Sequence, residues 1–125
     1  MATILIVDDS PTETFKITEI LTKSGHAVLT AASGEAGVAL AKKSQPDLVL
    51  MDVVMPGING FQATRQLTKD ATTCHIPVII VTTKDQETDK LWGKRQGASS
   101  YLTKPIDASL LVQAIDESLA LAAHR

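Results

Sequence analysis

Five short aliphatic runs, each followed by a longer segment with helical spacing, constrain the fold of this chain more than any other feature. The runs are rich in β-branched and aliphatic residues, which is typical of buried strands. They cover residues 4–7, 27–30, 48–51, 78–81 and, more weakly, 101–103. Strands that alternate regularly with helices predict a parallel sheet covered on both faces. We therefore expect an α/β fold.

The segments between the runs carry signals for the start and end of helices. Ser10 followed by Pro11 predicts an N-cap and a first helical position, and Gly25 predicts the end of that helix. Four further helices are expected at about 35–43, at about 61–69, between 85 and 97, and from Asp107 through Leu119. Only a tail of residues 122–125 is expected after the fifth helix, so the sequence predicts no output domain there.

The character of the runs predicts their order in the sheet. The first, third and fourth runs are continuously apolar, as in strands buried on both faces, whereas the second and fifth are shorter and more polar and belong at the edges. This favours the order 2-1-3-4-5, which is that of the flavodoxin-like (βα)5 three-layer sandwich. A chain of 125 residues is long enough for one domain, predicted to span 1–125.

Composition excludes several classes of protein. Aromatic residues make up 3% of the chain and hydrophobic residues 44%, so the core must be aliphatic. A net charge of −2 argues against a nucleic-acid partner. Cys74 is the single cysteine, which precludes an internal disulfide and predicts a cytoplasmic location. No apolar run approaches the roughly 20 residues of a membrane span, and the first run lacks the basic flank of a signal peptide.

Polar side chains follow four of the five predicted strands. Because the carboxyl ends of parallel strands share one edge of the sheet, where ligands bind in open α/β folds, these side chains should converge there. They are Asp8 and Asp9 after the first strand, Asp52 after the third, Thr82 and Thr83 at the end of the fourth, and Lys104 after the fifth.

This set of residues predicts a phosphoryl site. Neighbouring carboxylates repel unless a cation lies between them, and an all-oxygen pocket suits Mg²⁺. A metal, an ammonium group and a hydroxyl group directed at one point can hold the oxygens of a phosphoryl group, and aspartate can act as its acceptor. A single strand-end aspartate is more often a turn former or a helix cap. The combination therefore carries the prediction.

These stretches resemble the response-regulator receiver domains, the CheY-like family. The similarity covers essentially the whole chain and is carried by residues 4–10, 50–60, 77–82 and 97–105. It implies that Asp52 is the phospho-acceptor and that Asp8, Asp9, Asp52 and the backbone carbonyl of Val54 bind Mg²⁺. It also implies that Lys104 pairs with the phosphoryl oxygens.

The resemblance further implies how phosphorylation is read out. Thr82 would move to hydrogen-bond the phosphoryl group, and Tyr101 would turn inward into the space that Thr82 leaves. The Lys104–Pro105 bond would be cis, and Gly60 would shape the turn into the third helix.

Three positions depart from common family choices or tune the lifetime of the phosphoryl group. Thr83 is bulkier than the usual Ala or Gly and could narrow access to the site. Val54 cannot position a water molecule, and Lys84 could shield the phosphoryl group. We therefore expect slow to moderate self-hydrolysis.

A closer likeness links the chain to the PilH-type single-domain receivers of type IV pilus systems, which act in twitching motility. It is carried by residues 61–70 and 82–98. A flagellar-type chemotaxis receiver remains an alternative. Trp92, within the second segment, is either a partner contact or half-buried packing. Cys74 and His75 are interpreted as loop residues, since they lack zinc-ligand spacing.

The resemblance implies a stand-alone response regulator. A CheA-like histidine kinase would dock on the first helix, and a target protein would bind the face formed by the fourth helix, fifth strand and fifth helix. The chain would be a monomer that catalyses only its own phosphorylation and dephosphorylation. Whether it carries a signal or serves as a phosphate sink stays open.

Rival functions fit the residues less well. A phosphohydrolase that uses an aspartyl phosphate would need a general acid where Val54 stands. A flavodoxin-like FMN carrier would place a phosphate where Asp8 and Asp9 repel it. A pseudo-receiver that serves only as a scaffold would not need the full acidic set.

Overall fold

The computed structural model describes residues 1–123, in which five strands alternate with five helices. The strands are β1 (Thr3–Val7), β2 (Ala27–Ala31), β3 (Leu48–Met51), β4 (Val78–Thr82) and β5 (Ser100–Thr103). The helices are α1 (Pro11–Lys23), α2 (Gly34–Ser44), α3 (Gly60–Lys69), α4 (Glu87–Arg95) and α5 (Ala108–Ala123). The strands pair in parallel in the order β2-β1-β3-β4-β5, which confirms the predicted fold class and strand order.

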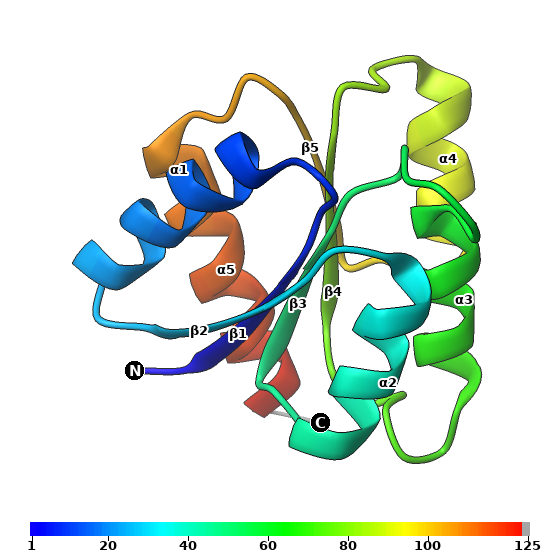
Figure 1. Ribbon diagram of the computed structural model, residues 1–125, viewed down its shortest axis with the longest axis horizontal. Helices are drawn as coiled ribbons and strands as arrows, with labels where there is room; N and C mark the ends of the chain where they lie inside the picture. Colours follow the sequence, from blue (N-terminus) through cyan, green and yellow to red (C-terminus); the bar gives the residue numbers. More distant parts are fainter. Residues whose placement is uncertain (124–125) are drawn as a thin grey trace.

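The sheet separates two layers of helices, with α1 and α5 on one face and α2, α3 and α4 on the other (Figure 1). Successive side chains of a strand point to opposite faces. Ile4 and Ile6 of β1 therefore pack in the cluster that includes α1 and α5, whereas Leu5 and Val7 pack with α2 and α3. The three-layer sandwich follows from this alternation.

The burial of the strands agrees with their predicted places. Every residue of β3 and β4 is buried, whereas β2 and β5 are only partly buried at the two edges. The largest wholly buried side chains are aliphatic, as the composition predicts: they are Ile4, Leu5, Ile6, Ile17, Leu21, Leu48, Leu50, Met51, Leu67, Ile79, Ile80 and Leu111.

Helix ends match the sequence signals at the start of α1 and differ at the end of α5. Ser10 caps α1 by accepting a hydrogen bond from the Glu13 N–H at 3.3 Å. The prediction that a tail begins at Ala122 is wrong, because α5 continues through Ala123. Alanine has the highest helix propensity, so two alanines extend the helix and do not end it. Residues 124–125 of the predicted tail lie outside the described residues.

None of the helices within residues 1–123 has the length and apolar character needed to cross a bilayer.

Candidate functional site

The carboxyl ends of β1 and β3 place Asp8 and Asp52 side by side at the centre of the sheet. Val7 pairs with Met51 in the parallel register, so the next residue of each strand leaves the sheet at the same level. The Asp52 N–H donates to the Val7 carbonyl oxygen at 2.9 Å and extends this pairing. The chain crosses from one side of β1 to the other here, so the site occupies the topological switch point.

Three carboxylates meet at this edge. Asp8, Asp9 and Asp52 each offer an oxygen atom within 4.8 Å of the others; Asp8 and Asp52 are buried and Asp9 is exposed. Backbone groups orient the two buried carboxylates. Asp8 Oδ1 accepts a hydrogen bond from the Ser10 N–H at 2.9 Å, and Asp52 Oδ1 accepts one from the Val53 N–H at 2.8 Å.

Lys104 brings the opposite charge to this cluster. Its Nζ donates to Asp8 Oδ2 at 2.8 Å and lies 3.7 Å from Asp52 Oδ2, with 9% of its side chain exposed. Its backbone N–H donates to the Thr82 carbonyl oxygen at 2.8 Å, and the bond to Pro105 is cis. One ammonium against three carboxylates leaves two negative charges uncompensated, and this excess favours binding of a divalent cation.

The charges of the cluster shift one another's pKa. Burial raises the pKa of Asp52; Lys104 opposes this, Asp8 adds to it, and the Val53 N–H opposes it, with a net rise. Burial lowers the pKa of Lys104, but the hydrogen bond to Asp8 and the charges of Asp52 and Asp8 raise it more, so the net shift is upward. Lys104 therefore stays protonated beside the two buried carboxylates.

The donor set fits a hard cation such as Mg²⁺. It consists of carboxylate oxygens, together with the predicted backbone carbonyl of Val54. The Val54 side chain is 56% exposed and offers no polar group. Within residues 1–123 the carbonyl oxygen of Val54 accepts no hydrogen bond, which leaves it available to a metal.

The loop between β3 and α3 is constrained from two sides. A Cβ atom on Gly60 would collide with the carbonyl oxygen of Asp52, so only glycine permits this close approach. On the other side, the Ile58 N–H donates to Glu35 Oε2 of α2 at 3.3 Å. This role of Glu35 was not predicted, because no local sequence pattern marks a contact between residues 23 positions apart.

The two predicted switch residues lie on neighbouring strands: Thr82 ends β4, and Tyr101 lies on β5 opposite Ile80, two positions before Thr82. Thr82 is wholly buried, and its Oγ1 accepts a hydrogen bond from the Lys84 N–H at 3.4 Å. The Tyr101 hydroxyl donates to the Lys84 carbonyl oxygen at 2.8 Å. Burial, with smaller contributions from Asp89, Asp85 and Asp52, raises the pKa of Tyr101 to about 12.

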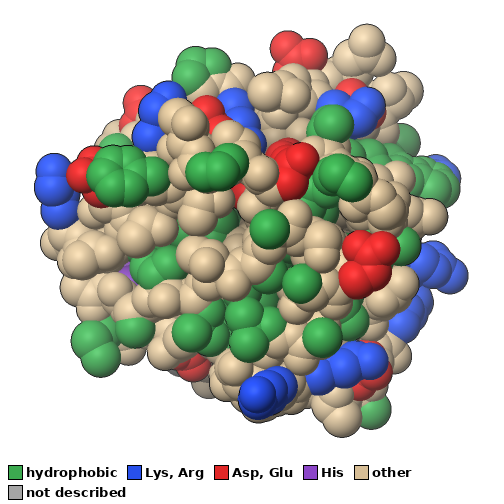
Figure 2. Space-filling view, viewed as in Figure 1, with side chains coloured by type: hydrophobic (Ala, Val, Ile, Leu, Met, Phe, Trp, Pro, Cys, Tyr) green, Lys and Arg blue, Asp and Glu red, His purple; other side chains and the backbone are tan. Residues whose placement is uncertain are grey.

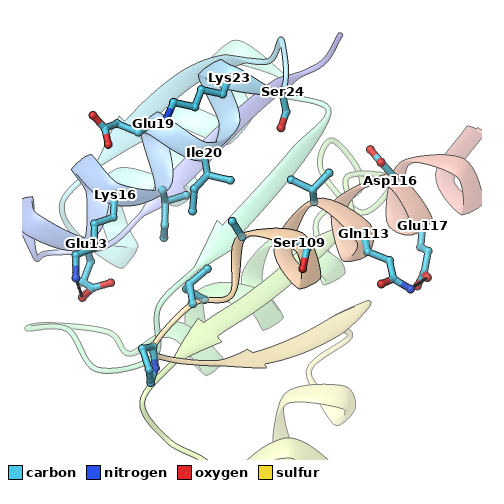
Figure 3. Close-up of a pocket in the computed structure, with 15 residues that line it drawn as sticks. Glu13, Lys16, Glu19, Ile20, Lys23, Ser24, Ser109, Gln113, Asp116 and Glu117 are labelled. Carbon is cyan, nitrogen blue, oxygen red and sulfur yellow. Dashed lines mark hydrogen bonds and ion pairs between the residues drawn. The ribbon is translucent and has the colours of Figure 1, made fainter.

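The remaining predicted residues lie around or away from this cluster. Thr83 and Lys84 are exposed just after β4. Pro105 lines a separate groove between α1 and α5 (Figure 3). Trp92 lies on α4 beside residues from the start of α3, so it does not belong to the acidic cluster. Cys74 is a free, exposed cysteine.

Comparison with known proteins agrees with this fold and site. Residues 4–116 match the family model of the response regulator receiver domain. The chain belongs to the response-regulator receiver family, so the class predicted from the sequence is confirmed. It is 69% identical over 120 residues to the protein PilH of Pseudomonas aeruginosa, a match that covers 96% of this chain and 99% of PilH. The predicted likeness to PilH is therefore confirmed as well.

More distant relatives share the same domain. The response regulator PleD of Caulobacter vibrioides is 43% identical over 110 residues, which cover 88% of this chain but 24% of PleD. A putative response regulator from Chloroflexus aurantiacus has a solved structure with a TM-score of 0.91 and 33% identity, covering 95% of this chain and 98% of that one. The chemotaxis protein CheY4 of Vibrio cholerae has a TM-score of 0.88 and 30% identity, covering 94% and 98% of the two chains.

Proposed function

We propose that Asp52 accepts a phosphoryl group from a phosphorylated histidine of a kinase, with Mg²⁺ bound at the acidic cluster. One observation carries this proposal: the buried Asp52 carboxylate lies 3.7 Å from the Lys104 ammonium, at the edge that also holds Asp8 and Asp9. A carboxylate with no such cationic partner would have no means of stabilising the charge of an acquired phosphoryl group.

The transfer step needs only groups of this chain and of the donor. An oxygen of Asp52 attacks the phosphorus atom, the bond between phosphorus and the histidine nitrogen breaks, and its electron pair remains on that nitrogen. Lys104 lowers the pKa of Asp52 against the effect of burial and can then pair with the phosphoryl oxygens. Mg²⁺, held by Asp8, Asp9, Asp52 and the Val54 carbonyl, would neutralise charge on the same oxygens.

The readout is proposed to run through Thr82 and Tyr101. Thr82 would turn its hydroxyl toward the phosphoryl group and give up its bond with the Lys84 N–H. Tyr101 would give up its bond to the Lys84 carbonyl oxygen and turn inward. Both bonds involve the same backbone residue, so the two movements are expected to be linked as a two-state change of the α4, β5 and α5 face.

The donor is proposed to dock over α1, next to the acidic cluster. A groove of about 930 Å³ runs between α1 and α5. Figure 3 shows Ile20 of α1 pointing toward α5, where Ser109 and Gln113 lie on the other side of the groove. A groove with an apolar floor and charged rims suits a helix of a kinase.

Phosphorylation is tested by incubating the protein with acetyl phosphate and Mg²⁺ and measuring the intact mass. The expected result is a gain of one phosphoryl group that is lost in Asp52→Asn. Asp116→Asn makes the same change at an exposed residue of α5 and should retain the gain. Absence of any gain with acetyl phosphate and with a donor kinase would contradict the proposal.

The likeness to PilH supports a place in a type IV pilus system. We expect the chain to restore twitching motility in Pseudomonas aeruginosa that lacks PilH, and Asp52→Asn to fail. Restoration of flagellar chemotaxis in its place would favour the flagellar-type alternative. A cytoplasmic location, a monomeric state and the choice between signal carrier and phosphate sink stay predictions.

A further inference from the structure

A second groove lies between α3 and α4, separate from the α1–α5 groove. Its volume is about 420 Å³, and its lining comes from the start of α3 and from α4: Asn59, Phe61, Gln62, Arg65, Trp92 and Gln96. Trp92 is 49% exposed at this groove, and its neighbour Leu91 is 54% exposed. Adjacent large apolar side chains left this open mark a surface that a partner can cover.

The surface around this α3–α4 groove is positively charged. None of its lining residues is acidic, and neither α3 nor residues 90–95 of α4 contain a carboxylate. Four exposed cations lie on these segments: Arg65, Lys69, Lys94 and Arg95. Within residues 1–123 none of the four forms an ion pair. Figure 2 shows Lys and Arg side chains along the edge of the molecule on the α3 side. In a chain of net charge −2 this is a local excess of positive charge.

The floor of the groove is connected to the acidic cluster by packing. Phe61 lines the groove and also packs with Val53, Ile80 and the partly buried Tyr101. Val53 directly follows Asp52, and its N–H donates to the Asp52 carboxylate. A ligand in the groove would therefore contact Phe61, which belongs to the same hydrophobic cluster as Val53 and Tyr101.

We propose that the α3–α4 groove binds an acidic segment of a partner protein, which inserts an apolar side chain beside Trp92 and pairs its carboxylates with Arg65 and Arg95. Tryptophan and arginine are the residues that contribute most at protein interfaces. The unpaired cations give charge complementarity to an acidic segment.

Regulation of this surface by phosphorylation is a second part of the inference, and it rests on the proposed function. Tyr101, which is proposed to turn inward on phosphorylation, packs against the cluster that contains Phe61 and Val53, the neighbour of Asp52. The affinity of the groove for its partner should then change, since a ligand that binds two conformations unequally is itself affected by the shift between them.

The docking surface can be tested on the unphosphorylated protein, independently of the proposed function. The probe is a synthetic helical peptide of Glu and Leu with one Phe, beside a counterpart with Lys in place of Glu. Trp92 is the only tryptophan of the chain, so its fluorescence reports directly from the groove. The acidic peptide should shift this emission and the basic peptide should not.

Matched variants test whether the acidic peptide binds in the groove. Arg65→Glu should lower the affinity for the acidic peptide by about tenfold or more, as expected for an interface hot spot. Lys43→Glu makes the same charge change at an exposed residue of α2 that does not line the groove, and it should leave the affinity within about twofold. Trp92→Ala, followed by calorimetry, should also weaken binding.

Three outcomes would overturn the proposal. They are no emission change with the acidic peptide, equal weakening by Arg65→Glu and Lys43→Glu, and tighter binding of single-stranded DNA or anionic lipid vesicles than of the peptide. Acetyl phosphate with Mg²⁺ then tests regulation, with Asp52→Asn as the control. An unchanged affinity after phosphorylation, verified by mass, would overturn the regulatory part. A failure to phosphorylate would count against the proposed function alone.

Discussion

At the scale of single residues, the chemistry of Asp52 depends on side chains that are distant in sequence. Asp8 and Lys104 lie 96 positions apart, yet a 2.8 Å hydrogen bond joins them beside Asp52. Burial raises the pKa of the Asp52 carboxyl group. The ammonium group of Lys104 opposes that effect, and the charge of Asp52 in turn raises the pKa of Lys104.

Val54 is expected to set the lifetime of the phosphoryl group. Its exposed apolar side chain offers no group that could orient an attacking water molecule. Val54→Asn supplies an amide at this position and should shorten the lifetime severalfold. The measurement is the loss of phosphoryl mass with time after acetyl phosphate is removed. Val54→Ala removes bulk and adds no polar group. It therefore tests whether easier access of water to the phosphoryl group, without any group that orients the water, shortens the lifetime. A wild-type half-life of a few seconds or less would contradict the prediction.

Asp70 is expected to contribute to stability in a pH-dependent way. Hydrogen bonds from Thr72, and then Lys42 at 3.2 Å, lower the pKa of Asp70 from 3.8 to about 2. A pKa lowered by folding adds stability above pH 3.8, and that stability is lost as the pH falls through about 2. Urea unfolding at a series of pH values should show a constant difference between wild type and Asp70→Asn above pH 3.8, shrinking below it. If the difference in the free energy of unfolding were undiminished at pH 2, the prediction would be contradicted.

At the scale of elements, the start of α3 links the acidic cluster to the α3–α4 groove. Asn59 Oδ1 accepts a hydrogen bond from the Gln62 N–H, and Gln62 Oε1 accepts one from the Asn59 N–H, each at 2.9 Å. With this capping box the helix has its N-cap at Asn59 and its first residue at Gly60, whereas the predicted start was about Phe61. It holds Gly60 against Asp52 and Phe61 beneath the groove.

Loss of this cap should destabilise the protein. Asn59→Ala removes the side-chain acceptor and should lower the free energy of unfolding by about 1 kcal/mol. Gln86→Ala is the matched control, because Gln86 caps α4 without a side-chain hydrogen bond. That variant should stay within about 0.5 kcal/mol of wild type. Both values come from urea unfolding, and equal losses in the two variants would show that the cap of α3 contributes nothing specific.

At the scale of the whole molecule, the sheet gathers the excess negative charge of three carboxylates at one edge. Their mutual repulsion destabilises the folded state unless a cation lies between them. A divalent cation should relieve that repulsion and stabilise the folded state, because the unfolded chain does not hold the three groups together.

Mg²⁺ is therefore expected to raise the free energy of unfolding, by about 2.7 kcal/mol at a hundredfold excess over its dissociation constant. Removal with a chelator should reverse the gain. Asp9→Asn should reduce the stabilisation by Mg²⁺, and it should disturb the structure little because Asp9 is exposed. Asp116→Asn should leave the stabilisation by Mg²⁺ unchanged. Thermal or urea unfolding with and without Mg²⁺ measures the stabilisation in wild type and in both variants. An equal response in the two variants would place the metal elsewhere.

Much of the architecture could be predicted because it depends on short-range periodicity. Aliphatic runs such as 78–81 make strands wherever they are buried, and polarity alone placed β2 and β5 at the edges. The meeting of Asp8 with Asp52 follows from parallel register once the strand order is known. Asn59 and Gln62 stand three residues apart, as a capping box requires, yet the helix was expected to start later, at about Phe61.

Contacts between side chains of different elements could not be predicted in this way. Nothing local to Glu35 indicates that it accepts a hydrogen bond from Ile58, and nothing local to Trp92 indicates that it lies beside the start of α3 and not at the acidic cluster. Strand identity, strand order and the residues of the acidic edge are thus properties of the sequence, because hydrophobic periodicity and chain direction dictate them. The support of the β3–α3 loop and the groove at Trp92 were decided only by tertiary packing, in which distant side chains meet at distances that no sequence pattern encodes.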